Sequence, residues 1–273
     1  MELVVDKRRA YAYTAAHELE PKKPTVVFVH GAGLEHSQFA LQSRYFGYHG
    51  RNVLAVDLPA HGRSEGPPRA TVQAMAGWLF EFLDAAKVDK ASIVGHSMGS
   101  LIGVECAALQ PARVERLALI GTAYPMKVGE AFLEAARRDD PAAFDMETIW
   151  GHAPQVALGA NPNPGMWMYG DALARLRRLA PGVLYNDLNA CHTYASGTES
   201  AAKVRCPVLA VSAEQDKIFP PEEGRILASS VRNGRFEMVP GAGHNLVVEK
   251  PQQTAEILTG FFSKIPLRPG GFL

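Results

Sequence analysis

Short runs of β-branched and other apolar residues alternate with longer segments of helical period, and this alternation restricts the fold more than any other feature. The runs TVVFVH at 25–30 and VLAVD at 53–57 are apolar almost throughout, which is typical of strands buried on both faces. A helix is predicted at 71–86 and a third buried strand, ASIVG, at 91–95. Strands and helices in this order form a mostly parallel sheet through right-handed crossovers.

The same alternation predicts further strands and helices before residue 125 and after residue 201. Residues 2–18 fit an antiparallel hairpin at the edge of the sheet. The other expected elements are a helix at 98–109, a strand at 116–121, a strand at 207–212, a helix at 222–230, a strand at 235–239 and a helix at 251–264.

Residues 125–201 break this pattern. Helical pieces there are interrupted by Pro and Gly, as in the stretch NPNPG at 161–165, and no convincing strand occurs. The sequence therefore predicts an α/β core made of residues 1–124 and 202–273, with a helical cap inserted at 125–201. At 273 residues the chain is long enough for such a domain to bury a large core.

Charge and composition exclude several classes of function. The 28 Lys and Arg residues equal the 28 Asp and Glu residues, so no net positive field would attract a nucleic acid. Cys106, Cys191 and Cys206 are too few and too widely spaced for a disulfide framework or a zinc site. No apolar run is long enough to cross a membrane, and the first residues lack the apolar segment of a signal peptide. We expect a cytoplasmic, soluble protein without a metal, nucleic-acid or membrane partner.

The pentapeptide Gly95-His96-Ser97-Met98-Gly99 lies where a predicted strand ends and a predicted helix begins. A serine on so tight a turn needs neighbours without side chains, because a Cβ at Gly95 or Gly99 would collide with adjacent backbone. The turn also directs the first N–H groups of the helix beside the serine hydroxyl. This context predicts that Ser97 is a nucleophile, and the alternative is a glycine-rich turn that only packs the helix on the sheet.

A serine hydroxyl is a weak nucleophile at neutral pH and needs a base with a pKa near 7. His244 follows the last predicted strand in the run PGAGH, so it lies at the same carboxyl edge of the sheet as Ser97. An acid must then orient the imidazole. Asp216 follows the penultimate strand in SAEQD, and we prefer it to Glu214 because the loop at 216–220 lets it point back over the edge. The alternative is that both carboxylates are solvated loop charges.

The oxyanion of a tetrahedral intermediate needs preorganised hydrogen-bond donors. The run HGAG at 30–33 follows the first long strand, and its small residues would let the backbone N–H of Ala32 approach the reacting carbon. The N–H of Met98 would be the second donor. An ordinary glycine turn at the end of the strand is the alternative.

Together these segments resemble the α/β-hydrolase family over essentially the whole chain outside the cap. The matching segments are GHSMG at 95–99, His30-Gly31, DLPAHGRS at 57–64, Asp216 with Pro220, and Gly243-His244 followed by Glu249 and Pro251. The resemblance implies an eight-stranded, mostly parallel sheet flanked by helices, and a triad in the order Ser97, Asp216, His244. Ala60 departs from the family, in which glycine is usual at this position, so the conformation of its loop is open.

The resemblance implies a carboxylesterase-like serine hydrolase that acts without a cofactor on a small, apolar substrate. Ser97 in place of aspartate is unlike epoxide hydrolases and haloalkane dehalogenases, so esters, lactones, thioesters and certain carbon–carbon bonds remain. Hydrolases of ring-cleavage products share the triad but usually have Gly-Pro-Gly after the His-Gly pair. This chain has Ala32-Gly33-Leu34 there, so we rank that activity second. A non-catalytic ligand-binding protein on the same fold is the third hypothesis.

A dinucleotide-binding fold is a rival interpretation, because Gly31 and Gly33 follow a strand and Asp57 ends the next one. The fingerprint fails at its third glycine, where His36 would obstruct the packing of helix on strand. It also leaves the three triad candidates without a role.

The cap contains the apolar residues Trp150, Met166, Trp167, Met168 and Tyr169. We expect them either to line an apolar substrate pocket over the nucleophile or to pack the cap onto the core. The sequence leaves both roles open, and it also leaves open whether the protein forms a homo-oligomer.

Overall fold

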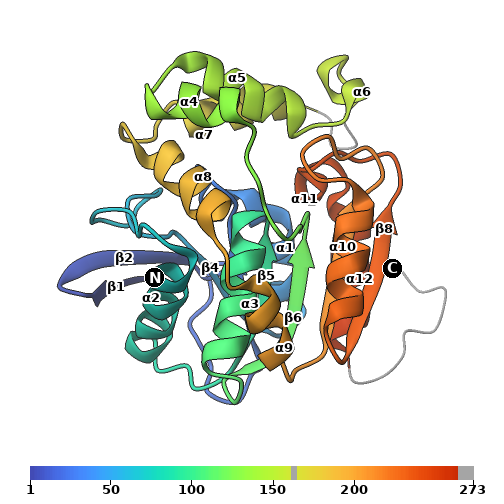
Figure 1. Cartoon of the computed structure of the whole chain (residues 1–273). Helices are drawn as coiled ribbons and strands as arrows, with labels where there is room; N and C mark the ends of the chain where they lie inside the picture. The colour runs from blue at the N-terminus through green and yellow to red at the C-terminus, as the bar shows by residue number, and fades with distance from the viewer. Residues whose placement is uncertain (161–164, 264–273) are drawn as a thin grey trace.

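The computed structural model describes residues 1–160 and 165–263, and it contains an eight-stranded sheet with helices on both faces (Figure 1). The strands are β1 (Glu2–Val5), β2 (Arg8–Tyr13), β3 (Thr25–Val29), β4 (Asn52–Val56), β5 (Ala91–His96), β6 (Val114–Ile120), β7 (Val208–Ala213) and β8 (Gly234–Val239). Their order across the sheet is β1-β2-β4-β3-β5-β6-β7-β8. β1 and β2 run antiparallel at one edge and the strands from β4 to β8 are parallel, which confirms the predicted fold class.

Helices connect the strands much as the periodicity predicts. Those of the core are η1 (His36–Phe39), α1 (Ala40–Tyr48), α2 (Val72–Ala85), α3 (Met98–Leu109), α10 (Pro221–Ser230), α11 (Leu246–Glu249) and α12 (Pro251–Phe262). The ends of most elements differ from the predicted ones by one or two residues. Lys264, the predicted end of the last helix, lies outside the described residues.

Alternate residues of each central strand pack against different helices. Val26 and Phe28 of β3 belong to the apolar core on the side of α1 and α12, whereas Val27 and Val29 belong to the core on the side of α2 and α3. Side chains of successive strand residues point to opposite faces, so a strand covered on both sides must be apolar throughout. Each fully buried side chain of this size stabilises the fold by about 1.5–3 kcal/mol.

Between β6 and β7 the described residues form six helices, which run from the top of Figure 1 down to the core. They are α4 (Glu130–Arg137), α5 (Pro141–Trp150), α6 (Pro154–Ala157), α7 (Met168–Leu176), α8 (Val183–Thr193) and α9 (Gly197–Lys203). The predicted cap boundary at residue 201 falls within α9, which packs against α3. Of the NPNPG stretch, residues 161–164 lie outside the described residues.

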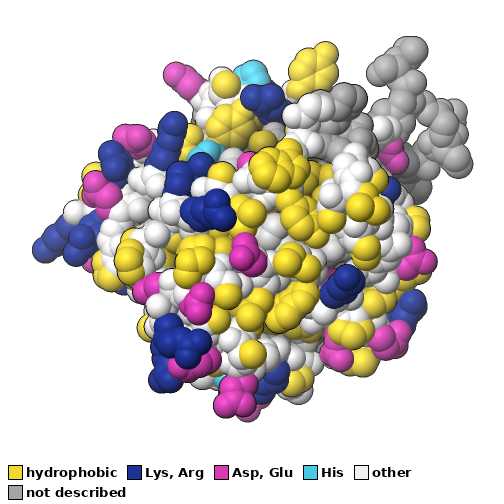
Figure 2. Space-filling model, turned by 90° about the horizontal axis from the view of Figure 1, so that it is seen from above, with side chains coloured by type: hydrophobic (Ala, Val, Ile, Leu, Met, Phe, Trp, Pro, Cys, Tyr) yellow, Lys and Arg dark blue, Asp and Glu magenta, His cyan; other side chains and the backbone are white. Residues whose placement is uncertain are grey.

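The outer face of the cap carries exposed apolar side chains. Figure 2, seen from above the cap, shows apolar side chains gathered near the middle of this face. Ile149, Trp150, Leu158, Met166 and Trp167 are the exposed large apolar residues of the cap among those the structure describes. Across residues 1–160 and 165–263, no helix combines the length and apolar character that a membrane crossing requires.

The loop after β4 keeps a conformation suited to glycine although residue 60 has a side chain. Ala60 has a φ of 71°, in the left-handed region that strains residues other than glycine. Gly62 has a φ of 51°, and a Cβ there would lie 2.3 Å from Asp57 Oδ2. Residue 60 therefore has a conformation suited to glycine, and its alanine side chain adds backbone strain.

We expect Ala60→Gly to raise the free energy of unfolding by about 1 kcal/mol, because the relief of left-handed strain outweighs the greater entropy of glycine in the unfolded chain. Urea unfolding measures the change. The matched control is Ala85→Gly, at an exposed helical position of α2, which should lower the free energy of unfolding by about 1 kcal/mol. A loss of stability in Ala60→Gly would contradict the strain.

Candidate active site

Ser97 lies on the turn between β5 and α3, with φ 52° and ψ −118°. Its N–H donates a hydrogen bond to the carbonyl of Ile120 in β6 at 2.8 Å. At both flanking positions only glycine fits, because a side chain would overlap neighbouring backbone atoms. A Cβ on Gly95 would lie 2.0 Å from Gly99 O, and one on Gly99 would lie 2.2 Å from Val29 O. Tight backbone packing of β3, β5 and α3 therefore holds this strained turn, with Ser97 partly exposed at the carboxyl edge of the sheet.

His244 and Asp216 meet from two different loops. His244 Nδ1 donates a hydrogen bond to Asp216 Oδ2 at 2.7 Å, and both side chains are only 1% exposed. The other oxygen of Asp216 accepts hydrogen bonds from the N–H groups of Ile218 at 2.8 Å and Phe219 at 2.9 Å. The loop that follows β7 thus fixes the carboxylate and directs it toward the imidazole.

Asp216 and His244 each shift the pKa of the other so that the charged forms are favoured. Burial alone would lower the pKa of His244, but the charge and hydrogen bond of Asp216 outweigh burial and raise it above 6.5. Burial would raise the pKa of Asp216, and the charge and hydrogen bond of His244 lower it instead. The rival acid, Glu214, accepts a hydrogen bond from the N–H of Gly241 at 2.8 Å and so stabilises the turn before His244.

The imidazole of His244 lies over the strand end next to Ser97. A Cβ on Gly121 would be 2.9 Å from His244 Cε1, and Gly121 follows the residue whose carbonyl binds the Ser97 N–H. In the part of the chain that the structure describes, no hydrogen bond joins Ser97 Oγ to His244 Nε2, and neither atom is bonded to another protein group. The Nε2 atom is therefore open to the serine hydroxyl or to a substrate.

The two expected oxyanion donors flank Ser97. A Cβ on Gly31 would lie 3.3 Å from Ser97 Cβ, so the loop that contains Ala32 runs directly beside the serine. Met98 is the first residue of α3, and such an N–H has no acceptor within its own helix. Among the described residues, the N–H of Ala32 also has no protein acceptor.

Three buried hydrogen bonds connect the loop of Ala32, the turn of Ser97 and the loop of His244. Gln38 Oε1 accepts from the N–H of Gly31 at 3.2 Å, and Gln38 Nε2 donates to His96 Nδ1 at 2.7 Å. His96 Nε2 donates to the carbonyl oxygen of His244 at 2.9 Å. Burial and the nearby His244 lower the pKa of His96 to about 3, so its ring stays neutral and serves as donor and acceptor. The sequence analysis missed Gln38, because a lone glutamine outside a motif carries no chemical signature.

A buried ion pair joins α8 of the cap to the loop that contains Ala32. Asp187 Oδ2, on α8, accepts hydrogen bonds from the N–H of Gly33 at 2.9 Å and from His61 Nε2 at 2.8 Å. His61 Nδ1 donates to the carbonyl of Pro59 at 3.0 Å. Both ring nitrogens thus face acceptors, and Asp187 outweighs burial to raise the pKa of His61. Asp187, also missed by the sequence analysis, thereby holds the residue next to Ala32.

We expect Asp187→Asn to lower the free energy of unfolding by about 3 kcal/mol near pH 6, because it leaves a buried imidazolium without its counter-charge. The pKa of His61 is raised above 6.5 and that of Asp187 is lowered below 3.8, so the pair stabilises fully between these values. Its contribution is lost as the pH rises through the folded pKa of His61. Urea unfolding of wild type and variant at about pH 6 and about pH 9 should show a smaller difference at the higher pH.

The control for this prediction is Asp145→Asn, at an exposed position of α5, which should change stability by less than about 0.5 kcal/mol. An equal effect of Asp187→Asn at both pH values would show that His61 carries no charge.

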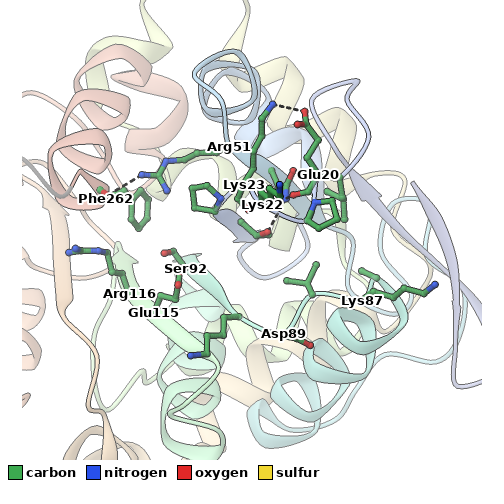
Figure 3. A pocket seen from close by; sticks show the side chains of 18 of the residues that line it. Glu20, Lys22, Lys23, Arg51, Lys87, Asp89, Ser92, Glu115, Arg116 and Phe262 are labelled. Atoms are coloured by element: carbon green, nitrogen blue, oxygen red, sulfur yellow. Dashed lines mark hydrogen bonds and ion pairs between the residues drawn. The ribbon is translucent and has the colours of Figure 1, made fainter.

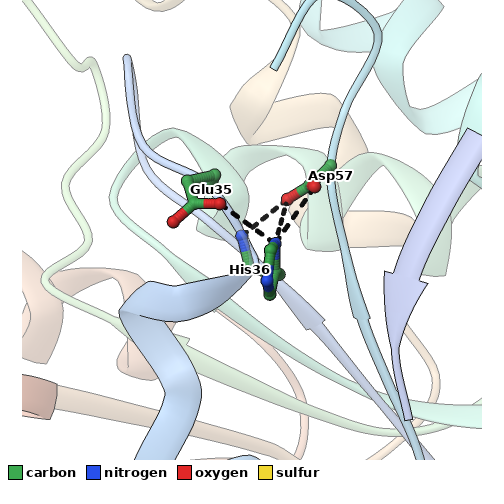
Figure 4. A group of neighbouring side chains, drawn as sticks. All are labelled: Glu35, His36 and Asp57. Atoms are coloured by element: carbon green, nitrogen blue, oxygen red, sulfur yellow. Dashed lines mark hydrogen bonds and ion pairs between the residues drawn. The ribbon is translucent and has the colours of Figure 1, made fainter. Parts of the chain in front are cut away.

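Figure 4 shows the cluster of Glu35, His36 and Asp57, whose ligand atoms lie close enough together to hold a metal ion. His36 Nδ1 donates to Asp57 Oδ1 at 2.8 Å and lies 3.1 Å from Glu35 Oε2. Burial would lower the pKa of His36, but the hydrogen bonds to both carboxylates raise it to about 9. At neutral pH the ring is protonated, and its proton occupies the position between the carboxylates that a cation would need.

Asp57 is also the residue that a dinucleotide-binding fold would direct to a ribose. Its carboxylate accepts hydrogen bonds from the backbone N–H of His36 at 2.7 Å and of Arg63 at 2.9 Å. These bonds commit Asp57 to the loops after β3 and β4, which agrees with the rejection of the dinucleotide interpretation.

The structure separates the apolar cap residues. Trp167 is 74% exposed and Trp150 is 40% exposed, with the Trp150 ring 5.9 Å from that of Phe132. Met166 is 38% exposed. Met168 is buried in the apolar core that includes Ala153, and the ring of Tyr169 lies 5.1 Å from that of His152. A Cβ on Gly243 would lie 2.6 Å from the carbonyl carbon of His152, so the segment that contacts Tyr169 packs directly against the His244 loop.

A groove of about 1460 Å³ lies at the opposite, amino edge of the sheet (Figure 3). Thr25, Asn52, Ser92 and Glu115, near the starts of four parallel strands, line it together with several Lys and Arg side chains. Ser97, Asp216 and His244 are not among its lining residues, so the groove is distinct from the site around Ser97.

The fold and these side chains define a hydrolase of the α/β type. The chain belongs to the alpha/beta hydrolase family, whose sequence pattern matches residues 26–257. It is 30% identical over 242 residues to the pimeloyl-[acyl-carrier protein] methyl ester esterase of Chromobacterium violaceum, covering 81% of this chain and 87% of the relative. It is 23% identical over 270 residues to the (E)-2-((N-methylformamido)methylene)succinate hydrolase of Acinetobacter baylyi, covering 97% and 98% of the two chains.

A solved structure shares the fold over nearly the whole length. The enol-lactonase of Burkholderia xenovorans superposes with a TM-score of 0.84 at 22% sequence identity, covering 96% of this chain and 99% of that one.

Proposed function

We propose that this protein is a serine hydrolase that cleaves a carboxylic ester, or a related acyl bond such as a lactone, in a small and largely apolar substrate. The observation that carries the proposal is the buried 2.7 Å hydrogen bond between His244 and Asp216, at the same edge of the sheet as Ser97 on its positive-φ turn. The names of the relatives, an esterase, a hydrolase and a lactonase, agree with acyl transfer.

In this mechanism Ser97 Oγ attacks the carbonyl carbon while its proton passes to His244 Nε2, and Asp216 stabilises the imidazolium. The N–H groups of Ala32 and Met98 bind the negative oxygen of the tetrahedral intermediate. The bond to the alcohol then breaks, and the alcohol leaves with the proton from His244. A water molecule attacks the acyl carbon, returns a proton through His244 and regenerates Ser97 as the acid departs.

The surroundings of the oxyanion loop support an apolar substrate. A Cβ on Gly33 would lie within 3.0–3.1 Å of the side chains of Leu176, Leu179 and Leu184 in the cap. Apolar side chains thus cover the loop that contains Ala32, which disfavours strongly hydrated groups next to the reacting carbonyl.

Two other functions would use the same fold. A hydrolase of carbon–carbon bonds would use the same triad on a ketone, and a panel of esters, lactones and ring-cleavage products separates the two activities. A ligand-binding protein would leave Ser97 unreactive.

We expect a fluorophosphonate probe to label the wild-type protein at Ser97 and to leave Ser97→Ala unlabelled, because the probe reacts with a serine that a base activates. Mass spectrometry of the labelled peptide identifies the site. Ser229→Ala, at an exposed serine of α10, is the matched control and should be labelled like the wild type. A wild-type protein inert both to the probe and to p-nitrophenyl acetate would favour the binding protein.

We expect kcat/KM for p-nitrophenyl acetate to rise with pH as His244 loses its proton, with a midpoint above 6.5 because Asp216 raises the pKa of His244. Asp216→Asn should lower turnover by about 10⁴-fold and move the midpoint to lower pH. Initial rates across the pH range measure both effects. A flat pH profile, or an Asn variant with wild-type turnover, would show that the base or acid is wrongly assigned.

A further inference from the structure

Glu147 is a titratable residue close to His244 that the proposed acyl transfer does not use. It lies in the last turns of α5, on the cap. Within residues 1–160 and 165–263, its carboxylate forms no hydrogen bond or ion pair. A partly buried carboxylate without a partner is costly, so a ligand that supplies the partner would be favoured.

The last turn of α5 is docked onto the loop that contains His244. The N–H of Asn245 donates to the carbonyl of Gly151 at 2.8 Å, and a Cβ on Gly151 would lie 2.8 Å from Asn245 Nδ2. Glu147 precedes Gly151 by four residues, and residues four apart share one face of a helix. Glu147 therefore lies one helical turn before Gly151, on the same face of α5 that contacts the loop of His244.

The carboxylate of Glu147 interacts electrostatically with the His244–Asp216 pair. Burial raises the pKa of Glu147 to about 6, with opposing effects of the charges of His244 and Asp216. Burial and Asp187 raise the pKa of Cys191 on α8, and the charge of Glu147 adds to that effect. Asp216 raises the pKa of His244 against burial, and Glu147 contributes in the same direction. The residue nevertheless keeps part of its surface accessible. Glu147 is therefore only partly covered by the surrounding protein.

Other charged side chains of the His244 loop, the neighbouring core loops and the cap helices already have partners. Asp216 bonds to His244, Asp187 to His61, Arg175 to Asp171, and Glu249 to the N–H groups of Gly243 and Ala153. Glu147 therefore leaves an uncompensated negative charge near His244, which attracts a cation and repels a second carboxylate.

We propose that Glu147 is a specificity-determining residue that binds a hydrogen-bond-donating, preferably cationic, group of the substrate where the end of α5 meets the loop of His244. The proposal rests on the proposed esterase function, and it extends the substrate class to esters that carry an ammonium or similar group away from the reacting carbonyl. The leucines over the oxyanion loop would contact the apolar part of such a substrate.

Three p-nitrophenyl esters of matched length test this proposal: 6-aminohexanoate with a terminal ammonium, heptanoate with a terminal methyl, and adipate with a terminal carboxylate. At about pH 8, where Glu147 is ionised, we expect the wild type to prefer the ammonium ester over the carboxylate ester in kcat/KM. Glu147→Gln should lower this ratio by about tenfold, the scale of one charge-assisted hydrogen bond. Lowering the pH through about 6 should lower the wild-type ratio and leave that of Glu147→Gln flat.

Asp145→Asn, on the exposed side of the same helix, is the matched control and should keep the wild-type ratio. An equal change of kcat/KM for all three esters in Glu147→Gln would reveal a structural role and overturn the proposal, as would a wild-type preference for the adipate ester.

A wild type that hydrolyses none of the three esters would count against the esterase function rather than the subsite. Calorimetric titration with hexylamine then tests the subsite alone. We expect about tenfold weaker binding to Glu147→Gln than to wild type, and equal binding to the two proteins would overturn the proposal.

Discussion

The close approach of three backbone segments at the end of β5 is the constraint on which the rest of the site depends. Gly95 and Gly99 have no room for a Cβ because carbonyl oxygens of α3 and β3 lie about 2 Å from where it would stand. This contact forces Ser97 into its left-handed conformation and brings its N–H to the carbonyl of Ile120. Gly121, the residue after Ile120, then lies directly against the imidazole of His244. One packing contact thus relates Ser97 to His244.

Buried polar groups turn this arrangement into a rigid frame. Gln38 and His96 join the loops of Gly31, Ser97 and His244 through hydrogen bonds. The His61–Asp187 pair joins α8 of the cap to the loop of Gly33. The hydrogen-bond partners of each imidazole ring decide whether it is charged. His96 has a donor at one ring nitrogen and an acceptor at the other, which suits a neutral ring. His61 faces acceptors at both ring nitrogens, which suits a protonated ring. Groups held in this way need little reorganisation when charge develops on a bound acyl group.

Local sequence signals were sufficient for most of the fold. Apolar runs predicted the central strands because both of their faces are covered, and the helix predicted at 98–109 has those bounds in the structure. The left-handed turn at Ser97 follows from its glycines. The roles of the cap residues could not be predicted in this way. Trp167 and Met168 are neighbours of similar apolar character, yet one is exposed and the other buried, because the orientation of α7 decides which face meets the core.

The sequence by itself determined the strand order along the chain, the glycines of the serine turn, and the candidates Ser97, Asp216 and His244, because each depends on local geometry or on a residue type at a strand end. Only the tertiary structure decided that Asp216 rather than Glu214 faces His244, that Asp187 crosses from the cap to the oxyanion loop, and that Glu147 is left without a partner among the described residues. These contacts join residues distant in sequence, and their energies depend on burial and on the charges brought together by folding.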